Sequence, residues 1–416
     1  MSDDKKDVRR GGVDRGTEVN RDQAGGRGGP AGTRGRVVHL RRTLIVGTGS
    51  IAGAHAAAVA ANGARAVVVA GVDVDPARAE SFAARHGIEG WSADLRTALG
   101  QTWADDGKLD LAHICTPPGS HVPLAVQCLE AGVPVLLEKP PALSLAEVDE
   151  LIAVSERTGV DVAVVFQHRF GSGARRAQAL LADSGRLDEG IGRPLLATCH
   201  TLWYRDADYF AVPWRGRWDT EGGGPTMGHG IHQFDLLLAL LGPWTEVTAM
   251  AGRQARDTDT EDVSMAVVRF ASGALATIVN SVVSPRQTST LRIDTERATL
   301  EVEHLYGYTD ADWTFTAAPG HEDLAALWTT DDAEPRSSHA SQMEALLDAM
   351  DRGEHLPVPL SEARKTLELV AAIYASAFTG QVVRRGDIGP GHPFYTRMDG
   401  TGSPWAVTPK SEENIT

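Results

Sequence analysis

Apolar runs of strand length alternate with helix-length segments through the first part of the chain. Ala-rich segments between the runs predict helices at about 51–62, 76–86, 120–132 and 144–158. The runs themselves predict buried strands at Leu44–Val46, Ala66–Val72, Leu111–Ile114, Val133–Leu137 and Val160–Phe166. Regular alternation of strand and helix predicts a doubly wound α/β domain with a parallel sheet.

The pattern changes after about Phe166, where strands follow one another with little helix between them. Thr288–Asp294 alternates apolar and polar residues, as an antiparallel strand with one buried face does. Ser361 is a candidate N-cap of the last helix, and Gly380 lies just past its end. An α+β domain is therefore expected. Its helices are predicted at Ala174–Ser184, Gly230–Leu241, His339–Met350 and Ser361–Phe378, and its strands at Thr245–Gly252, Val263–Phe270, Ala274–Val283, Ser289–Asp294 and Thr299–Leu305.

Length and composition extend this division to the ends of the chain. A chain of 416 residues exceeds what one hydrophobic core usually serves, so two domains with tails are expected. Residues 1–38 are rich in Gly, Arg and Asp, which predicts a disordered tail without function or, alternatively, an extension that binds something acidic. The expected parts are then an α/β domain over 39–165, an α+β domain over 166–388 and a C-terminal tail over 389–416.

Charge and cysteine content exclude several classes of partner and site. The net charge of −15 disfavours binding to nucleic acid or to anionic membranes. Only three cysteines occur, none in a CxxC, so neither a disulfide framework nor a zinc knuckle is expected. No apolar run approaches the length of a membrane span, and the sequence after Arg9-Arg10 lacks the apolar region of an export signal. A soluble, cytoplasmic protein is expected.

A glycine-rich turn joins the first predicted strand to the first helix and has the form GxGxxA. In such a turn the first glycine permits the tight bend, the second lets the backbone approach a pyrophosphate, and the small third residue allows close packing of helix on strand. An acidic residue, Asp73, ends the second strand 24 positions beyond Gly49. These features predict a dinucleotide site formed by Gly47, Thr48, Gly49, Ser50, Ile51 and Asp73.

The choice between the two nicotinamide cofactors depends on the charge beside the ribose. A carboxylate at Asp73 accepts hydrogen bonds from ribose hydroxyls and repels a 2′-phosphate, which favours NAD over NADP. Arg78 and Arg65 lie close enough in the sequence to keep NADP as the alternative.

Glu138-Lys139-Pro140 closes an apolar run that is expected to be a buried strand. The carboxyl ends of the strands are where ligands bind in an open α/β sheet. A lysine in a partly desolvated cleft has a lowered pKa and serves as a general acid or base. The alternative is a lysine that caps an exposed strand edge.

The segment Cys115–His121, together with Gly47–Ala52 and Glu138-Lys139-Pro140, resembles the Gfo/Idh/MocA family of nicotinamide-dependent sugar and cyclitol oxidoreductases. The resemblance covers about residues 40–385. It implies a Rossmann domain that binds NAD or NADP, followed by an open-faced, mostly antiparallel sheet domain for substrate binding and oligomerisation. A homodimer or homotetramer is expected from it.

The resemblance also implies roles for individual residues. Lys139 is expected to face both the nicotinamide and the substrate, and His232 occupies the position of the family's catalytic histidine. The implied cofactor contacts, beyond the glycine-rich turn and Asp73, are Thr116, Pro117, His121, Glu138, Lys139 and Gln167. Aromatic, Arg and His side chains suit a polyol pocket, and the expected substrate contacts are Arg169, Tyr204, Trp214, Arg215, His229 and His232. Arg169 has a surface or domain-interface position as its alternative, and the aromatic residues have a domain core or oligomer interface.

One position departs from the family pattern. Many members carry an aspartate four residues before the catalytic histidine, whereas this chain has Gly228. His229 is a possible replacement, and the aspartate's role stays unfilled. The spacing His229-x-x-His232-x-x-Asp235 places three potential metal ligands on one helix face, but no further ligand has a recognisable spacing, so no metal is expected.

The expected function is the NAD-dependent oxidation of a ring hydroxyl in a sugar, glycoside or cyclitol. Lys139 and His232 would take the hydroxyl proton while the carbinol hydride passes to the nicotinamide. One alternative is glycoside hydrolysis or elimination assisted by bound NAD without net redox change. A second is a non-catalytic regulator that senses NAD on the same fold.

Overall fold

The computed structural model describes residues 39–103, 107–182, 190–329 and 335–405. The predicted tail over 1–38, the end of the helix predicted at 174–184 and the last residues of the predicted C-terminal tail lie outside the described residues. Among the helices that are described, none is both long and apolar enough to cross a membrane.

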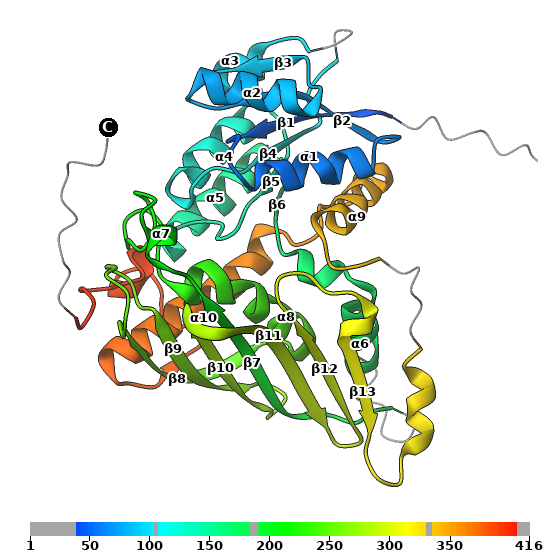
Figure 1. Ribbon diagram of the computed structural model, residues 1–416, viewed down its shortest axis with the longest axis vertical. Helices are drawn as coiled ribbons and strands as arrows, with labels where there is room; N and C mark the ends of the chain where they lie inside the picture. The colour runs from blue at the N-terminus through cyan, green and yellow to red at the C-terminus, as the bar shows by residue number, and fades with distance from the viewer. Residues whose placement is uncertain (1–38, 104–106, 183–189, 330–334, 406–416) are drawn as a thin grey trace, which may run out of the picture. The chain divides into compact units, whose positions relative to one another are not determined.

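The first of the two sheets is parallel and has six strands in the order β3-β2-β1-β4-β5-β6 (Figure 1). The order reverses between β1 and β4, which confirms the predicted Rossmann topology. The strands are β1 Arg41–Val46, β2 Ala66–Val72, β3 Gly90–Ser92, β4 Leu111–Ile114, β5 Val135–Leu137 and β6 Val162–Val164. Every neighbouring pair is parallel, so all carboxyl ends meet at one edge.

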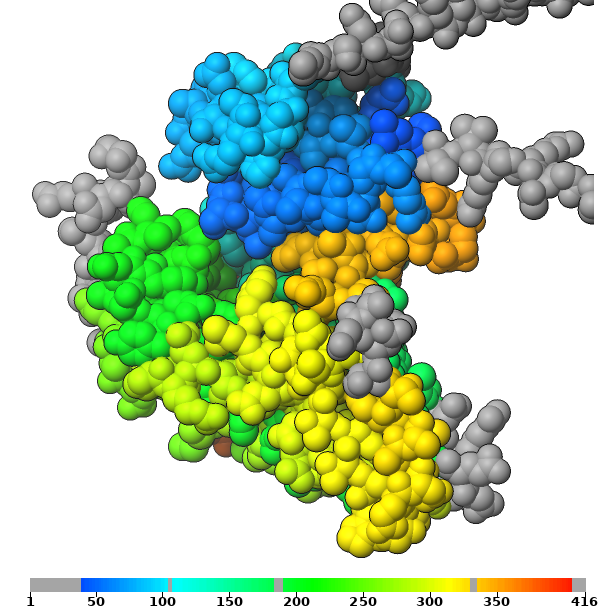
Figure 2. Space-filling model, turned by 45° about the vertical axis from the view of Figure 1, so that its right-hand side comes forward, coloured from blue at the N-terminus to red at the C-terminus, as the bar shows by residue number. Residues whose placement is uncertain are grey.

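Helices cover both faces of this sheet because its strands are apolar on both sides. In β5, Leu136 packs with the cluster of α1 and α9, whereas Val135 and Leu137 pack with the cluster of α4 and α5. Helix α9 comes from the far end of the chain and packs against α1 (Figure 2). The helices around the sheet are α1 Ala52–Ala61, α2 Pro76–His86, α3 Leu95–Gly100, α4 His121–Glu130, α5 Leu145–Thr158 and α9 His339–Arg352.

The second sheet has eight strands in the order β13-β12-β11-β7-β10-β9-β8-β14. It is antiparallel except for the pair β7 and β10, so the predicted mostly antiparallel sheet is confirmed. Its strands are β7 Pro194–Tyr204, β8 Trp244–Gly252, β9 Val263–Phe270, β10 Leu275–Ser281, β11 Val283–Thr295, β12 Ala298–His304, β13 Trp313–Ala317 and β14 Val383–Arg384.

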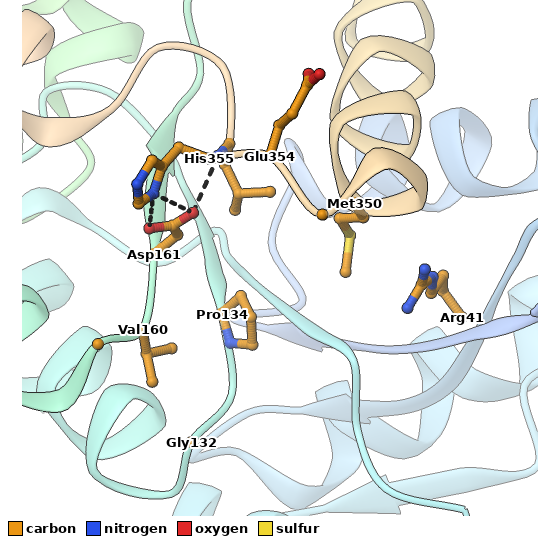
Figure 3. Close-up of a pocket in the computed structure, with 11 residues that line it drawn as sticks. Arg41, Gly132, Pro134, Val160, Asp161, Met350, Glu354 and His355 are labelled. Atoms are coloured by element: carbon orange, nitrogen blue, oxygen red, sulfur yellow. Dashed lines mark hydrogen bonds and ion pairs between the residues drawn. The ribbon is translucent and has the colours of Figure 1, made fainter.

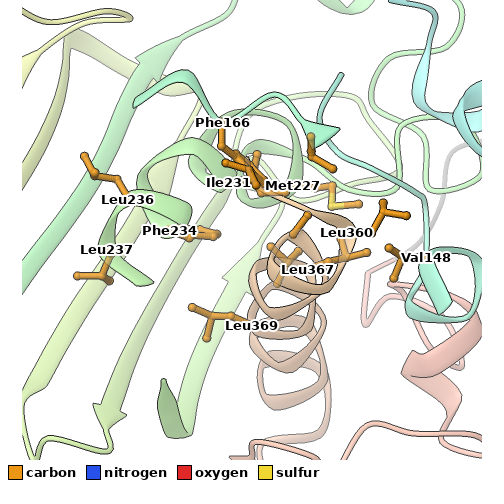
Figure 4. Packing of buried hydrophobic residues seen from close by; sticks show 14 of the residues in the cluster. Val148, Phe166, Met227, Ile231, Phe234, Leu236, Leu237, Leu360, Leu367 and Leu369 are labelled. Atoms are coloured by element: carbon orange, nitrogen blue, oxygen red, sulfur yellow. The ribbon is translucent and has the colours of Figure 1, made fainter. Parts of the chain in front are cut away.

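Helices cover one face of this second sheet. Phe234 and Leu237 from α8 pack with Leu367 from α10 in the core that Figure 4 shows. The other face is open: on β8 and β9, Met250 is 79% exposed and Met265 is 55% exposed. The remaining helical elements are η1 Pro118–Ser120, η2 Gln167–Phe170, α6 Ser172–Ala182, α7 Ala207–Phe210, the π-helical η4 Thr226–Gly230, α8 Ile231–Leu241, η5 Asp310–Asp312, η6 Glu322–Leu327, α10 Leu360–Thr379 and α11 Pro393–Thr396.

Two cap predictions for α10 have different outcomes. Gly380 ends the helix in the left-handed conformation at φ 69°, which confirms the predicted C-cap. The predicted N-cap Ser361 is wrong, because the helix begins at Leu360 and Pro359 occupies the capping position. The ring of proline fixes φ near −65°, and the φ of −64° at Pro359 agrees with this constraint.

Candidate active site

Four loops that carry predicted site residues leave the parallel sheet at its carboxyl edge. Gly47 follows β1, Asp73 follows β2, Thr116 lies just after β4, and Glu138-Lys139 follows β5. Because neighbouring strands are parallel, these loops are side by side around the point where the strand order reverses. Ligands of doubly wound sheets bind at this crevice.

The glycine-rich turn fits a dinucleotide. Gly47 has φ 83°, and a Cβ at this position would meet the Thr116 Cγ2 atom at 2.6 Å, so only glycine is accommodated. A Cβ at Gly49 would meet nothing within 4 Å, which leaves room for an anion above the turn. Helix α1 starts directly after this turn and has no side-chain cap, and a helix N-terminus favours an anion.

Asp73 is held by the turn that it faces. Its Oδ2 accepts hydrogen bonds from the backbone N–H and the hydroxyl of Thr48, both at 2.9 Å. The two arginines considered for NADP differ in position: Arg65 pairs with Asp348 and Asp351 beside the amino end of β2, whereas Arg78 pairs with Asp75 close to Asp73.

His121 joins two loops of the crevice. Its Nε2 lies 2.9 Å from the Thr116 carbonyl oxygen and its Nδ1 lies 2.8 Å from the Pro140 carbonyl oxygen. Burial lowers the pKa of His121. Its ring therefore lies between the loops after β4 and β5, with each nitrogen near a backbone carbonyl oxygen. Pro117 directly follows Thr116 in the first of these loops. The Thr116 hydroxyl is buried without a hydrogen-bond partner among the described residues, which suits a bound cofactor.

Glu138 is surrounded by histidines that the sequence pattern does not reveal. Its Oε1 lies 2.9 Å from His55 Nε2 and 3.2 Å from His339 Nε2, and His55 Nδ1 lies 3.0 Å from His113 Nδ1. Burial alone would raise the pKa of Glu138, but the two histidine contacts outweigh it and hold the pKa well below its usual value. The carboxylate is thereby fixed as an anion beside Lys139, whose backbone N–H it also accepts at 3.1 Å.

This cluster has the composition of a metal site, with ligand atoms of His55, Glu138 and His339 all within 4.8 Å of one another. Both imidazoles already contact the same Glu138 oxygen, so hydrogen bonding explains the arrangement and we assign no metal to it.

Lys139 reaches from the parallel sheet to the segment that carries His232. Its Nζ donates to the Gly228 carbonyl oxygen at 2.8 Å, four residues before His232. Burial lowers the pKa of Lys139, although the carboxylates of Glu138 and Glu221 oppose the shift. The lysine is thus closer to neutrality than an exposed one, as a proton acceptor requires.

His232 is buried, at 3% exposure, in the first turn of α8. Neither of its ring nitrogens has a hydrogen-bond partner within the part of the chain that is described. Burial and the nearby charge of Lys139 lower its pKa well below the usual value. The neutral imidazole has one N–H donor and one acceptor nitrogen, and both are available for a hydrogen bond to a bound molecule.

An aromatic wall extends from His232 toward the second domain's β7. Trp203 and His229 have ring centroids 5.1 Å apart, Tyr209 and His229 5.8 Å, and Trp203 and Tyr306 6.2 Å. Arg215 lies over the Tyr209 ring at 3.9 Å. Of these, Trp203, Tyr209 and Tyr306 were not predicted as site residues.

Several predicted substrate contacts lie elsewhere or are already engaged. Tyr204 is 42% exposed on the sheet face opposite Trp203, because successive side chains of β7 alternate. Trp214 stacks with Arg215, whose guanidinium is 4.3 Å from its ring. Gln167, a predicted cofactor contact, donates to the Tyr306 hydroxyl at 3.3 Å.

Arg169 has its guanidinium bound within the protein. Its Nε and Nη2 each donate to Asp235 at 2.6 Å, and Nη1 contacts Glu362. Both partners, on α8 and α10, lie in the same predicted domain as Arg169, so the guanidinium joins elements of the second domain and not the two domains to each other. Asp235 also accepts from Thr366 at 3.1 Å, so its carboxylate serves this network and not a metal site with the neighbouring histidines.

A separate hollow lies at the opposite edge of the parallel sheet (Figure 3). It has a volume of about 660 Å³ and is lined by Arg41, Pro134, Asp161 and His355, among others. Arg41 begins β1 and Asp161 precedes β6, so the hollow is at the amino ends of the strands. It is therefore remote from the crevice described above.

Comparison with known proteins decides the family. Residues 41–166 match the family described as "Oxidoreductase family, NAD-binding Rossmann fold", and residues 175–301 match the "GFO/IDH/MocA C-terminal domain". The two matches together span more than half of the chain. The chain belongs to the Gfo/Idh/MocA family of oxidoreductases. The family that the sequence motifs predicted is thus confirmed, and this Gfo/Idh/MocA protein is an NAD(P)-dependent oxidoreductase by family.

Relatives of this Gfo/Idh/MocA protein include sugar and inositol dehydrogenases. It is 25% identical over 301 residues to the D-glucoside 3-dehydrogenase of Escherichia coli K12, covering 66% of this chain and 78% of that one. It is 29% identical over 258 residues to the scyllo-inositol 2-dehydrogenase (NAD(+)) of Bacillus subtilis 168, covering 59% and 69%.

Among solved structures, the WlbA dehydrogenase of Bordetella pertussis, in complex with NADH and UDP-GlcNAcA, matches with a TM-score of 0.73 and 25% identity. The match covers 83% of this chain and 98% of that chain.

Proposed function

We propose that this protein is an NAD-dependent dehydrogenase that oxidises a ring hydroxyl of a sugar, glycoside or cyclitol. The observation that carries the proposal is the contact between Lys139 Nζ and the Gly228 carbonyl oxygen at 2.8 Å. This contact brings a lysine from the nucleotide crevice beside the segment that bears His232. The names of the relatives, which are sugar and inositol dehydrogenases, support the substrate class.

In this proposal Lys139 and His232 handle the proton of the reacting hydroxyl. Bound NAD would supply a nicotinamide C4 that accepts the hydride from the carbinol carbon. Lys139, with its lowered pKa, takes the hydroxyl proton as the carbonyl forms, and neutral His232 donates or accepts the second hydrogen bond to the same oxygen. Glu138, anchored by His55 and His339, holds the strand end that presents Lys139.

A polyol pocket is proposed on the aromatic wall. The faces of Trp203 and Tyr209 suit the C–H faces of a pyranose or cyclitol ring, and Arg215 and His229 suit its hydroxyls. The sequence predicted Tyr204 and Arg169 as contacts in this pocket, but Tyr204 is exposed on the opposite sheet face and Arg169 is bound to Asp235. The proposed pocket therefore uses Trp203 and Tyr209 instead.

NAD is proposed as the preferred cofactor. The Asp73 carboxylate lies at the nucleotide end of the crevice, where it would repel a 2′-phosphate. Arg65 is bound to two carboxylates beside the amino end of β2, so only Arg78 of the two considered arginines is near Asp73. Relatives of both kinds exist, since a matched D-xylose 1-dehydrogenase is named as an NADP(+) enzyme.

A homodimer or homotetramer is proposed from the open face of the second sheet. Met250, Met265 and Val267 are exposed side by side, with Met250 paired to Met265 in register. A cluster of exposed large apolar side chains on a sheet face is typical of an interaction surface.

The test of the proposed function is a screen for NAD reduction at 340 nm over hexoses, glycosides, inositols and sugar acids, repeated with NADP. The proposal predicts NADH formation with at least one compound. Product formation without NADH would instead support NAD-assisted hydrolysis or elimination. Tight NAD binding with no turnover of any compound would support a non-catalytic sensor and contradict the proposal.

A further inference from the structure

Glu221 is a buried carboxylate at the edge of the proposed pocket. It precedes three consecutive glycines, Gly222–Gly224, and is 6% exposed. Its Oε2 accepts the backbone N–H of Gly216 at 2.6 Å, and its Oε1 lies 3.5 Å from the Arg215 guanidinium. The carboxylate is therefore held in one place by the loop that carries the pocket residues.

The carboxylate points at Gly228. A Cβ built on Gly228 would have the Glu221 Oε1 atom, at 3.5 Å, as its single neighbour within 4 Å among the described residues. Gly228 itself is not among the glycines with positive φ, so its backbone does not require glycine. The absence of a side chain at 228 thus opens a space that the Glu221 oxygen borders.

Lys139 borders Gly228 as well. Its Nζ donates to the Gly228 carbonyl oxygen at 2.8 Å, so the ammonium and the Glu221 carboxylate converge on the same residue. The negative charge of Glu221 acts on Lys139 and opposes the effect of burial, whereas Arg215 acts in the opposite direction. Burial, with the charge of Lys139 as the next cause, lowers the pKa of both His229 and His232.

We propose that Glu221 is the carboxylate member of the proton-handling group, stabilising the ammonium of Lys139 across Gly228 after Lys139 has taken the hydroxyl proton. Glu221 fills the role that the sequence left open at position 228, and fills it from a different loop. It is a positioning residue, because it acts through Lys139 and not on the substrate. This inference rests on the proposed function.

The charged and titratable groups that face Lys139 determine the sign of the expected effect. They are the carboxylates of Glu138 and Glu221, the guanidinium of Arg215, and four histidines: His121, His168, His229 and His232. Replacing Glu221 by glutamine removes one of two favourable charges and leaves Arg215 in place. The pKa of Lys139 should therefore fall in Glu221→Gln.

The experiment measures the pKa of Lys139 directly and does not require a substrate. The folded protein with NAD is labelled with acetic anhydride across a pH series, and modification of Lys139 is quantified by peptide mass spectrometry. Glu221→Gln is expected to move the labelling midpoint down by about 1 pH unit, the low end of the effect of an adjacent opposite charge. Glu261→Gln is the matched control: Glu261 is a buried carboxylate that binds the same glycine segment and is not among the groups that act on Lys139, so the midpoint should stay.

A second pair of variants covers the case in which Glu221→Gln does not fold. Gly228→Asp places another carboxylate in the open space and should raise the Lys139 midpoint, whereas the neutral Gly228→Asn should not. With a substrate in hand, the rising limb of the plot of kcat against pH should move with the labelling midpoint of each variant. In the double variant Glu221→Gln/Gly228→Asp, kcat should return to within about tenfold of the parent's.

The outcomes separate this inference from the proposed function. Unmoved Lys139 midpoints in Glu221→Gln, or in Gly228→Asp where Glu221→Gln is unfolded, would overturn the role of Glu221 whatever the enzyme oxidises. If the midpoints shift but none of the sugars and cyclitols tested leads to NAD reduction, the interaction between Glu221 and Lys139 is supported and the proposed function is overturned.

Discussion

Asp73, at the carboxyl end of β2, accepts two hydrogen bonds from Thr48 of the glycine-rich turn. The side chain has one role in the fold and one proposed role in cofactor choice. An isosteric replacement separates the two, because an amide oxygen still accepts a hydrogen bond but carries no charge to repel a 2′-phosphate.

The first prediction therefore concerns Asp73→Asn. The ratio of kcat/KM with NADP to kcat/KM with NAD should rise by about tenfold or more, which corresponds to about 1.4 kcal/mol. Steady-state kinetics with both cofactors on one substrate measure it. An unchanged ratio would mean that Asp73 does not select the cofactor. The companion variant is Arg78→Ala, in which the same ratio should fall below that of the parent.

Several residues of the site were out of reach of sequence reasoning for one physical reason. His55 on α1 and His339 on α9 contact Glu138, and His113 on β4 contacts His55, only because the sheet and a helix from the far end of the chain bring them together. In contrast, Gly47, Asp73 and Lys139 follow strands directly, and the rule that ligands bind at strand carboxyl ends was sufficient to predict them.

At the scale of elements, the turn before α8 depends on close approach of backbone to backbone. Gly224 lies at this turn, and its N–H donates to Glu261, as does that of Thr226. A Cβ on Gly224 would meet the Glu261 carbonyl oxygen at 1.9 Å, whereas a Cβ on Gly228 would meet one side-chain atom at 3.5 Å. The same substitution at the two glycines should have different effects.

The second prediction is that Gly224→Ala lowers the free energy of unfolding by about 2–4 kcal/mol, because backbone must move to relieve the clash. Gly228→Ala, its matched control, should change stability by less than about 1 kcal/mol. Urea denaturation followed by tryptophan fluorescence measures both. Equal losses in the two variants would show that the turn has room at Gly224.

Element prediction succeeded for three strands whose apolar residues contrast with polar or turn residues on either side. Ala66–Val72, Leu111–Ile114 and Val263–Phe270 were predicted with the observed bounds. The short β3, Gly90–Ser92, and the helix α3, Leu95–Gly100, were missed, since neither provides enough residues for a periodic pattern. Both form against neighbouring elements: β3 pairs with β2, and α3 packs on β2, β3 and α4.

For the whole molecule, buried histidines should set the response to acid. Burial lowers the pKa of each of them below the usual 6.5, so the unfolded chain binds protons that the folded protein does not. The stability that this difference gives is therefore fully present above pH 6.5 and is lost as the pH falls. Each histidine lowers the free energy of unfolding by about 1.4 kcal/mol per pH unit while the pH lies between its pKa in the unfolded chain and its pKa in the folded protein. The residues concerned are His55, His113, His121, His168, His229, His232 and His304.

The third prediction is that Tm falls by more than about 5 °C between pH 7 and pH 5. Glu261 works in the other direction, because burial raises its pKa to about 7 and protonation on acidification relieves the buried charge. Glu261→Gln should therefore show an even steeper loss of Tm over this range. Differential scanning fluorimetry across the pH series measures both proteins, and a constant or rising Tm in the parent would contradict the prediction.

The fourth prediction concerns assembly through the open sheet face. Met265→Lys places a charge in the centre of the exposed apolar cluster with Met250 and Val267 and should dissociate the proposed homo-oligomer. Multi-angle light scattering after size exclusion measures the mass. Arg286→Lys, at an exposed position on β11, is the control that should keep the parent's mass. A parent that elutes as a monomer would contradict the proposal.

The central claim is that Lys139 takes the proton in an NAD-dependent oxidation, and Lys139→Met tests it most directly. Turnover in the NAD-reduction assay should fall by about 10²–10⁴-fold, while the Kd for NAD, measured by calorimetry, stays within about twofold of the parent's. Lys365→Met, on an exposed position of α10, should keep full activity. A Lys139→Met protein that turns over as fast as the parent would contradict the account.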